Sequence, residues 1–262
     1  MSFYLSQGDM GAVGLEPTET EVEGFTVGCC STHWSKKKSK MRKKTLISWS
    51  SGKDSAWTLH VLREDPTIEI VGLFCTVNKF FDRVAIHGVR SELLLKQAES
   101  VNLPVEIIDI PYPCNNEDYE RIMTSFVAKA KQRGIECFAF GDLFLEDIRS
   151  YRERNLQGTG ITPLFPLWGI PTKILSKQMV SNGLKAIITC INAEQFSQEY
   201  AGREYNESFL KEIPDRIDPC GENGEFHSFA FDGPMFQYPI KVIPGETIQR
   251  DNAYFTDLLP SR

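Results

Sequence analysis

Residues 48–55 read Ser48-Trp49-Ser50-Ser51-Gly52-Lys53-Asp54-Ser55, and this stretch is the most informative part of the chain. A short apolar strand at residues 45–47 leads into it, and a helix-like segment at residues 56–62 follows it. A strand, a loop of small residues and a helix N-terminus together form a site for phosphate, because backbone N–H groups and the positive helix end face the anion. The alternative is an ordinary strand-to-helix turn capped by a serine.

The commoner Walker loop does not fit these residues. It requires a glycine where this chain has Ile47, and a hydroxyl residue where it has Asp54. The residues fit the pattern Ser-Gly-Gly-x-Asp-Ser instead, with Ser51 in place of the first glycine. This pattern resembles the pyrophosphate loop of adenine-nucleotide α-hydrolase enzymes, which cleave ATP between the α and β phosphates. The resemblance implies nucleotide binding by Ser48, Ser50, Ser51, Gly52, Lys53, Asp54 and Ser55.

The chain after this loop alternates between predicted strands and helices. We expect strands at 68–75, 105–110 and 137–140, a helical face through Leu94, Ala98 and Val101, and a helix from Asn116 or Glu117 that ends at Gly134. Such alternation predicts an α/β fold, with a parallel sheet and helices on both faces.

Ligands of such sheets bind beyond the carboxyl ends of the strands. The stretch 76–78 and the pair Gly141-Asp142 are expected there, beside the loop. Gly141 would let the backbone approach the nucleotide. Asp142 would bind a ribose hydroxyl or magnesium, or would cap a helix that starts at Leu143, and the sequence leaves both alternatives open.

The second half lacks this alternation, and we expect a smaller α+β domain there. We place the nucleotide domain at 43–160, the second domain at 161–250 and a tail at 251–262. A flexible acidic loop, Asp218-Pro219-Cys220-Gly221-Glu222-Asn223-Gly224-Glu225, precedes a strand that begins near Phe226. Its carboxylates Glu222 and Glu225 are candidates for binding magnesium through water, for orienting an amine, or for general base catalysis. The alternative is an exposed acidic turn. Cys220 is a weaker candidate for a nucleophile, and His227 is more typical of an ordinary strand histidine.

The composition is that of a globular protein. The chain has 262 residues, of which 41% are hydrophobic and 24% are charged, and its net charge is −6. Neither nucleic acid nor a membrane is indicated as a partner. Seven cysteines without a Cys-x-x-Cys pair argue against a disulfide framework and a zinc site. We expect Cys75, Cys137 and Cys190 to be buried and the protein to be cytoplasmic.

Residues 1–40 do not share this pattern. They are acidic up to Glu23 and then basic from Lys36 onward, without a periodic apolar face. We expect a disordered or mis-annotated extension, with Met41 as the true start. A nuclear-localisation or nucleic-acid patch is the alternative for the basic run.

Three motifs together carry a more specific resemblance. The loop at 48–55, the pair Gly141-Asp142 and the loop Gly221-Glu222-Asn223-Gly224-Glu225-Phe226 resemble those of the diphthine–ammonia ligase family, over residues 43 to about 243. The resemblance implies a HUP-type nucleotide domain and a smaller C-terminal domain. It also implies ATP and Mg²⁺ as cofactors. A carboxylate, either free or protein-borne, would form an acyl-adenylate that ammonia or an amine converts to an amide. The resemblance further implies that the candidate catalytic residues are Lys53, Asp54, Glu222 and Glu225, and that Asp54 is the candidate magnesium ligand.

The chain departs from the archaeal and eukaryotic ligases at several positions. Asn223 replaces a glycine, and His227-Ser228 replace Glu-Thr. The segment after Gly141 also differs, and in this respect the chain looks like a bacterial branch of the family. Arg149, Arg152 and Arg154 are predicted to form a basic helix face near the site, which binds phosphate or an acidic substrate or is simply solvated. The alternatives are a nucleotide-binding protein that does not release pyrophosphate, and an ATP pyrophosphatase with another substrate, such as a tRNA-modifying enzyme.

Overall fold

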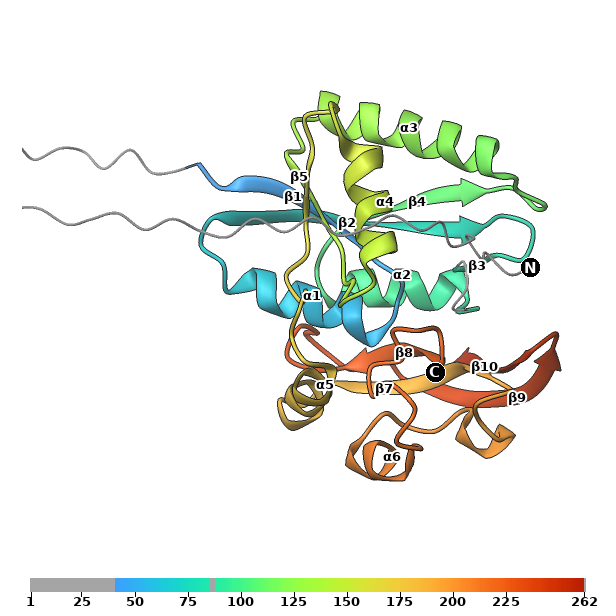
Figure 1. The fold of residues 1–262 in the computed structure, drawn as a ribbon. Coiled ribbons are helices and arrows are strands. Elements are labelled where there is room, and N and C mark those ends of the chain that lie inside the picture. The colour runs from blue at the N-terminus through green and yellow to red at the C-terminus, as the bar shows by residue number, and fades with distance from the viewer. Residues whose placement is uncertain (1–40, 85–87, 262) are drawn as a thin grey trace, which may run out of the picture. The chain divides into compact units, whose positions relative to one another are not determined.

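The structure is a computed structural model that describes residues 41–84 and 88–261. The predictions about residues 1–40 therefore lie outside the described residues. The described part contains a six-stranded sheet followed by a four-stranded sheet (Figure 1).

The first sheet is mostly parallel and is built around the strand that leads into the loop. Its strands are β1 (Lys43–Ser48), β2 (Ile68–Asn78), β3 (Arg83–Val84), β4 (Val105–Ile110), β5 (Cys137–Ala139) and β6 (Thr162–Leu164). The order is β3-β2-β1-β5-β6, with β4 paired to β2, and only the two-residue β3 is antiparallel. The stretch 76–78, expected beyond a strand, lies within β2 because β2 continues to pair with β4 as far as Asn78.

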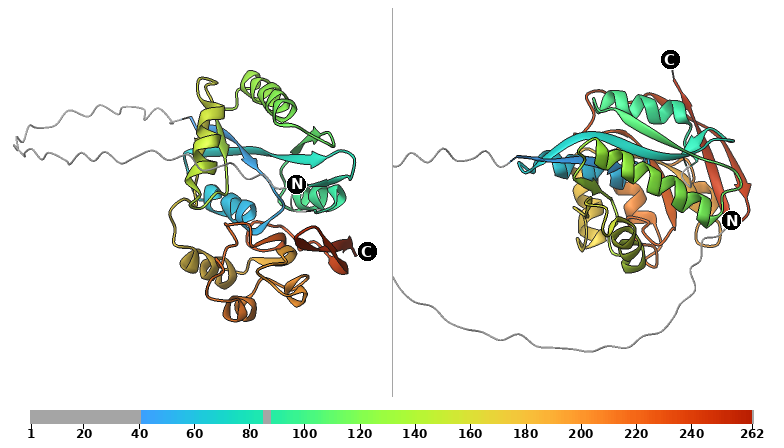
Figure 2. Two further views of the ribbon diagram at one scale, coloured as in Figure 1. Left: turned by 45° about the vertical axis from the view of Figure 1, so that its right-hand side comes forward. Right: turned by 90° about the horizontal axis from the view of Figure 1, so that it is seen from above.

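Helices cover both faces of this sheet. The helices α1 (Lys53–Arg63) and α2 (Ser91–Ser100) lie on one face, and α3 (Asn116–Gln132) and α4 (Glu146–Leu156) lie on the other (Figures 1 and 2). On the α3 side, Phe74 of β2 packs with its ring centroid 5.0 Å from Phe126 and 4.8 Å from Phe138. The predicted α/β class, with helices on both faces of the sheet, is confirmed.

The boundaries of α3 follow from its sequence. The side chain of Asn115 accepts a hydrogen bond of 2.8 Å from the backbone N–H of Asp118, which caps the helix N-terminus. Gly134 lies just beyond the C-terminus with φ of +81°, the left-handed conformation that glycine adopts without strain. Phe126 and Ala130 are buried on one helix face, so the helical pattern was predicted correctly.

The second half forms an antiparallel sheet in the order β8-β7-β10-β9. Its elements are α5 (Thr172–Ser181), β7 (Lys185–Asn192), a short 3-10 helix η1 (Gln198–Tyr200), α6 (Glu207–Glu212), β8 (Phe226–Asp232), β9 (Val242–Arg250) and β10 (Ala253–Pro260). The expected tail at 251–262 instead contributes β10, which lies between β7 and β9 and buries Thr256 and Leu258. The first sheet likewise extends to Leu164, beyond the expected boundary at 160.

The two sheets share α1 and α2 as a common layer (Figure 1). Trp57 and Leu59 of α1 belong to the same buried core as Phe229 of β8. Arg63 of α1 donates hydrogen bonds to the carbonyl oxygens of Val101, at 2.6 Å, and of Met235, at 2.7 Å. Residues from both halves can therefore meet at the start of α1. In the described ranges, no helix is long and apolar enough to cross a membrane.

Candidate active site

The loop at 48–55 has the geometry that its sequence predicts. It runs from the carboxyl end of β1 into α1, whose N-cap residue is Gly52. Gly52 has no side chain to cap the helix, so the positive helix end can receive an anion. The hydroxyl groups of Ser50 and Ser55 lie 3.4 Å apart across the loop, and Ser55 also donates to the Gly52 carbonyl oxygen at 2.9 Å.

Ser51 adopts a conformation that is unusual for serine. Its φ is +69°, in the left-handed region that glycine prefers, and its side chain is fully buried. Its hydroxyl oxygen is one of the buried atoms in the described ranges without a hydrogen-bond partner. At this position the pyrophosphate-loop pattern has a glycine, and Ser51 adopts the left-handed conformation that a glycine would adopt more easily.

Lys53 points from the loop toward the second half. Its ammonium lies 2.8 Å from the Asp54 carboxylate and donates to the carbonyl oxygen of Cys220. It also lies 5.1 Å from the centre of the Phe226 ring. Burial lowers the pKa of Lys53, but Asp54 and the other negative groups outweigh it, so the pKa is raised and the ammonium stays charged. Its charge is therefore already engaged by groups of the protein.

Gly141 and Asp142 lie beside the loop, at the end of β5. A Cβ atom on Gly141 would come within 3.0 Å of the backbone carbon of Asp54, so this glycine lets β5 approach the start of α1. Asp142 does not cap a helix, because α4 starts later, with Leu145 as its N-cap residue. The carboxylate of Asp142 instead faces Arg152, with an Oδ2–Nε distance of 3.5 Å. Burial raises the pKa of this carboxyl.

The predicted basic face of α4 is not one surface. Arg152 lies in the pocket, with its guanidinium 4.9 Å from the centre of the Phe140 ring. Arg149 stacks on Phe165 and Trp168 instead, at 5.1 and 4.7 Å. Arg154 lines a different, shallow hollow. The helix turns these side chains in different directions, so the prediction of one basic face is wrong.

The acidic loop is held by its own hydrogen bonds and is less free than its glycines suggest. Glu225 is 3% exposed, and its Oε1 accepts from the backbone N–H of Asp218 and from the side chain of Asn223, each at 3.0 Å. The carboxylate of Asp218 in turn accepts from the backbone N–H of Glu222 at 2.9 Å. Gly221 has φ of +71°, and a Cβ there would lie 2.8 Å from the Phe226 carbonyl oxygen. The loop therefore presents Glu222 in a fixed position.

Glu222 reaches across to the first half. Its Oε1 accepts a hydrogen bond of 2.7 Å from the backbone N–H of Leu143. Burial raises the pKa of this carboxyl to about 7, helped by the negative charges of Asp54 and Asp142 and opposed by the Leu143 hydrogen bond and Lys53. Glu222 can therefore accept or release a proton near neutral pH.

The thiol of Cys220 is not suited to nucleophilic attack. It is buried and lies 3.6 Å from the Thr172 carbonyl oxygen, to which it donates. Burial raises the pKa of this thiol far above its ordinary value, so it stays protonated. Cys75, Cys137 and Cys190 are buried, as predicted.

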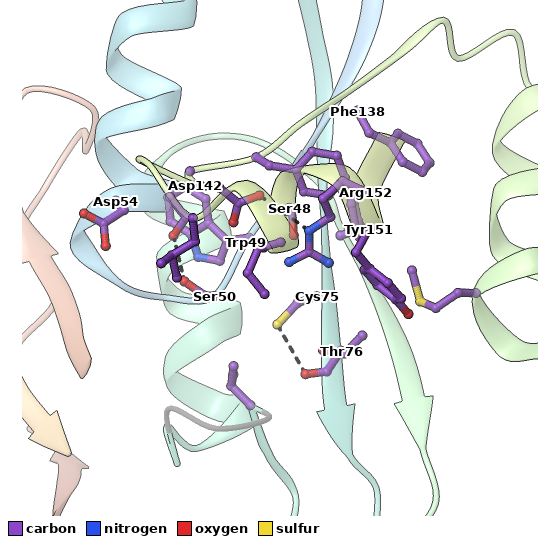
Figure 3. Close-up of a pocket in the computed structure, with 18 of the residues that line it drawn as sticks. Ser48, Trp49, Ser50, Asp54, Cys75, Thr76, Phe138, Asp142, Tyr151 and Arg152 are labelled. Atoms are coloured by element: carbon purple, nitrogen blue, oxygen red, sulfur yellow. Dashed lines mark hydrogen bonds and ion pairs between the residues drawn. The ribbon is translucent and has the colours of Figure 1, made fainter. Parts of the chain in front are cut away.

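These groups surround one pocket of about 570 Å³, a size typical of small-molecule sites (Figure 3). One end is polar and is formed by the loop and by Glu222. The other end is largely apolar, under α3 and α4, with Tyr151 and Arg152 pointing into it (Figure 3). Of the predicted site residues, the lining includes Ser48, Ser50, Lys53, Asp54, Ser55, Gly141, Asp142 and Glu222. Ser51, Gly52 and Glu225 lie outside this lining, whereas His227 and Ser228 belong to it.

Sequence reasoning missed one residue, Gln97 of α2. It is fully buried in the apolar face that the leucines of α2 form, and it hydrogen-bonds to Trp49 and Ser51 of the loop. A glutamine three residues after Leu94, on a face of apolar side chains, was the available signal.

Comparison with protein families identifies the group to which this architecture belongs. Residues 43–163 match the diphthamide synthase N-terminal domain, and residues 171–257 match the diphthamide synthase C-terminal domain. The chain belongs to the diphthamide synthase family. The two matches cover both sheets, and they include the loop at 48–55 as well as Glu222.

Among curated proteins, this family member is similar to diphthine–ammonia ligases. The zebrafish protein is 31% identical over 155 residues, which are 56% of this chain and 60% of the relative. The mouse and human proteins are each 24% identical, over 140 and 141 residues, or 52% of either chain. The chain thus spans only about half the length of the mouse and human relatives that it matches.

Proposed function

We propose that this chain is an ATP-dependent carbon–nitrogen ligase that activates a carboxylate as an acyl-adenylate and converts it to an amide with ammonia. The observation that supports the proposal most strongly is that a phosphate-binding loop and the carboxyl group of Glu222, with a pKa of about 7, line the same pocket. Residues 43 to about 160 form the nucleotide-binding half in this proposal, and the following residues supply the groups that act on the acyl substrate.

The phosphates of ATP would lie against the loop. Ser48, Ser50 and Ser55 line the pocket with hydroxyl groups, and the N-terminus of α1 adds its positive dipole end. Lys53 is held by Asp54 and by the Cys220 carbonyl oxygen. We propose that the positive charge of Lys53 stabilises the departing pyrophosphate without direct contact. In the first step a carboxylate oxygen attacks the α-phosphorus, and the bond to the β-phosphate oxygen breaks.

The residues fit the binding of Mg²⁺ together with the phosphates. Asp54 has a buried carboxylate oxygen, Oδ1, without a hydrogen-bond partner in the described part of the chain. Mg²⁺ is commonly bound through one or two carboxylates together with substrate phosphates, so a single carboxylate oxygen of this kind suits it. Bound there, the ion would offset the negative charge that develops on the pyrophosphate.

We propose that Glu222 is the base of the second step. Ammonium must lose a proton before its nitrogen can attack the acyl carbon, and a carboxylate with a pKa near 7 is suited to take that proton. The new carbon–nitrogen bond forms as the bond to the AMP oxygen breaks, and the nitrogen releases its second excess proton to the departing AMP phosphate or to water. Glu225 lies behind Glu222, in contact with Asp218 and Asn223, and we assign it the role of positioning the loop.

Arg152 is the second cation of the pocket. It stands between the loop and the largely apolar end, and its pairing with Asp142 is long, at 3.5 Å. We propose that Arg152 binds an anionic group of the substrate or of the adenylate, while Asp142 binds a ribose hydroxyl or holds the guanidinium in place.

The first carboxylate to test is diphthine, because the curated relatives are named for it. Two of the positions at which this chain departs from the archaeal and eukaryotic ligases, His227 and Ser228, line the pocket, whereas Asn223 does not. The hydroxyl of Ser228 accepts a hydrogen bond of 3.2 Å from the backbone N–H of Lys53. Ser228 thus keeps the hydroxyl that a threonine would supply. His227, in contrast, places an imidazole where the other ligases have a glutamate, and we propose that this change alters which acyl substrate binds.

The test is a product assay with ATP, ammonium and candidate carboxylates. We expect AMP and pyrophosphate to form in equal amounts with the amide, and only when ammonium and the correct carboxylate are both present. Release of ADP and phosphate would contradict the proposal. Binding of ATP without release of pyrophosphate, with every carboxylate tested, would favour a non-catalytic nucleotide-binding protein.

A further inference from the structure

Gln97 forms three hydrogen bonds in the interior between the two sheets. Its side-chain oxygen accepts from the indole Nε1 of Trp49 at 2.9 Å. Its side-chain nitrogen donates to the carbonyl oxygens of Ser51, at 3.0 Å, and of Ala230, at 2.6 Å. Trp49 and Ser51 belong to the phosphate-binding loop, and Ala230 belongs to β8 of the second sheet.

The chemistry of the neighbours fixes the orientation of this amide. An indole N–H can only donate, and backbone carbonyl oxygens can only accept. A flipped amide would place its NH₂ group against the indole N–H and its oxygen against two carbonyl oxygens. Gln97 is also fully buried, so water cannot replace these bonds at low cost. Only an amide group in this orientation satisfies all of these neighbours.

The second sheet makes a direct contact with the same atom of the loop. The backbone N–H of Ala230 donates to the Ser51 carbonyl oxygen at 2.9 Å, so this oxygen accepts from both Gln97 and β8. Ser51 is the residue with φ of +69°. Because C=O and N–H point in opposite directions in a trans peptide, a fixed Ser51 carbonyl directs the N–H of Gly52 the other way. That N–H faces the hydroxyl of Ser50, which lines the pocket.

We propose that Gln97 is a positioning residue that sets the nucleotide-binding shape of the loop and makes that shape depend on the second sheet. The inference rests on the proposed function for its ligand, ATP. Gln97 acts through Ser51 and Trp49 and is not in the lining of the pocket. In this arrangement the loop is in its binding conformation only when β8 is in place.

Two variants and two readouts test the inference on the full chain. Gln97→Leu removes all three bonds and keeps a similar volume. We expect faster amide hydrogen exchange at residues 48–55 and at least about tenfold weaker ATP binding by calorimetry. In Gln97→Glu the carboxylate would face the carbonyl oxygens of Ser51 and Ala230, so ATP binding should weaken at high pH and recover as the pH falls and the carboxyl becomes protonated. A buried charge at position 97 would weaken a merely space-filling contact as well, so the inference requires that exchange at residues 48–55 change with pH more than exchange elsewhere in the chain.

Ser100→Ala is the matched control. Ser100 is a buried residue of the same helix whose hydroxyl donates to the Tyr238 carbonyl oxygen, so it also links α2 to the second half, but without contact to the loop. We expect lower thermal stability, with loop exchange and ATP affinity within about twofold of wild type. Unchanged loop exchange in Gln97→Leu would overturn the inference, and so would equal losses in Ser100→Ala. Hydrogen exchange needs no ligand, so a wild-type chain that fails to bind ATP would count against the proposed function alone.

Discussion

The loop at 48–55, which we propose binds phosphate, and the acidic loop at 218–225 both contribute to one pocket, but the residues that set their shapes differ in origin. In the acidic loop, the carboxylates of Asp218 and Glu225 hold the turn from within, through the Glu222 N–H, the Asp218 N–H and the Asn223 side chain. In the loop at 48–55, the left-handed residue Ser51 is instead held from outside, by Gln97 of α2 and Ala230 of β8. Both loops have further bonds of the other kind, but the conformation of Ser51 depends on distant parts of the chain.

This difference suggests separate roles for the two loops, one in binding the nucleotide and one in positioning Glu222. A loop whose shape is set by the second sheet can be ordered or loosened by whatever binds there, because its contacts are long-range. A turn that is fixed by its own carboxylates keeps the backbone of Glu222 in place with or without the nucleotide. We infer that binding of ATP is the adjustable step and that the position of Glu222 is the constant one. The following predictions test this comparison.

The largest effect is expected from the acidic loop. Glu222→Gln keeps an oxygen for the Leu143 N–H but removes the base, so amide formation should fall by about 10²- to 10⁴-fold. In the wild type, amide formation should rise as the pH increases through about 7, where the Glu222 carboxyl loses its proton. The variant should lose this pH dependence while ATP affinity stays within about threefold. Rate measurements from pH 5.5 to 8.5 will decide, and an unaltered profile would remove Glu222 from the mechanism.

The same variant should be more stable than the wild type at high pH. The folded-state pKa of Glu222 is about 7, above its ordinary value of 4.5. The folded state therefore binds the extra proton between these values, and wild-type stability falls as the pH rises from 4.5 through 7. Glu222→Gln should gain about 1 to 3 kcal/mol in unfolding free energy at pH 8, and much less at pH 5. Urea unfolding at the two pH values measures this, and an equal gain at both would show that charge burial is not the cause.

The next effect is expected from Lys53, which connects the two loops. Lys53→Ala removes the ammonium that joins Asp54 to the Cys220 carbonyl oxygen. We expect pyrophosphate release to slow by at least about tenfold, which is roughly 1.4 kcal/mol in activation free energy. Lys185→Ala is the control, since it removes a surface ion pair of 2.9 Å with Asp232 away from the pocket. Turnover that is unchanged in Lys53→Ala would mean that the loop acts without this charge.

Much of the fold was predictable because its signals are local. The strand before Ser48, the helix start at Asn116 and the glycine at 134 each depend on neighbouring residues, and the structure confirms them. Residues 251–262 were misjudged as a tail. The strand β10 pairs locally with β9 across the turn at Asp251-Asn252, which was overlooked, and it pairs with β7 across about sixty positions, which a local pattern does not indicate.

The candidate site, like the fold, was predictable from the sequence only where local residues determine it. Residue types suggested the phosphate-binding loop and Glu222, but not the contacts that orient them. The neighbours of Gln97 on α2 indicate that it is buried but not what it contacts, because its partners Trp49 and Ala230 lie far away in sequence. The side chains of Arg149 and Arg154 were misplaced since helix position alone does not fix which neighbour a long side chain contacts, and the aromatic rings of Phe165 and Trp168 hold Arg149.

The smallest effect concerns the serine that replaces a glycine. Ser51 at φ of +69° carries a left-handed strain of about 1 kcal/mol, and its buried hydroxyl is without a hydrogen-bond partner in the described residues. Ser51→Gly relieves both, but the unfolded chain gains about 0.5 to 1 kcal/mol of conformational freedom. We expect a net stabilisation below about 1 kcal/mol in thermal unfolding. Ser51→Ala keeps the strain and removes only the hydroxyl, so a glycine variant less stable than the alanine variant would show that β8 and Gln97 hold this residue without strain.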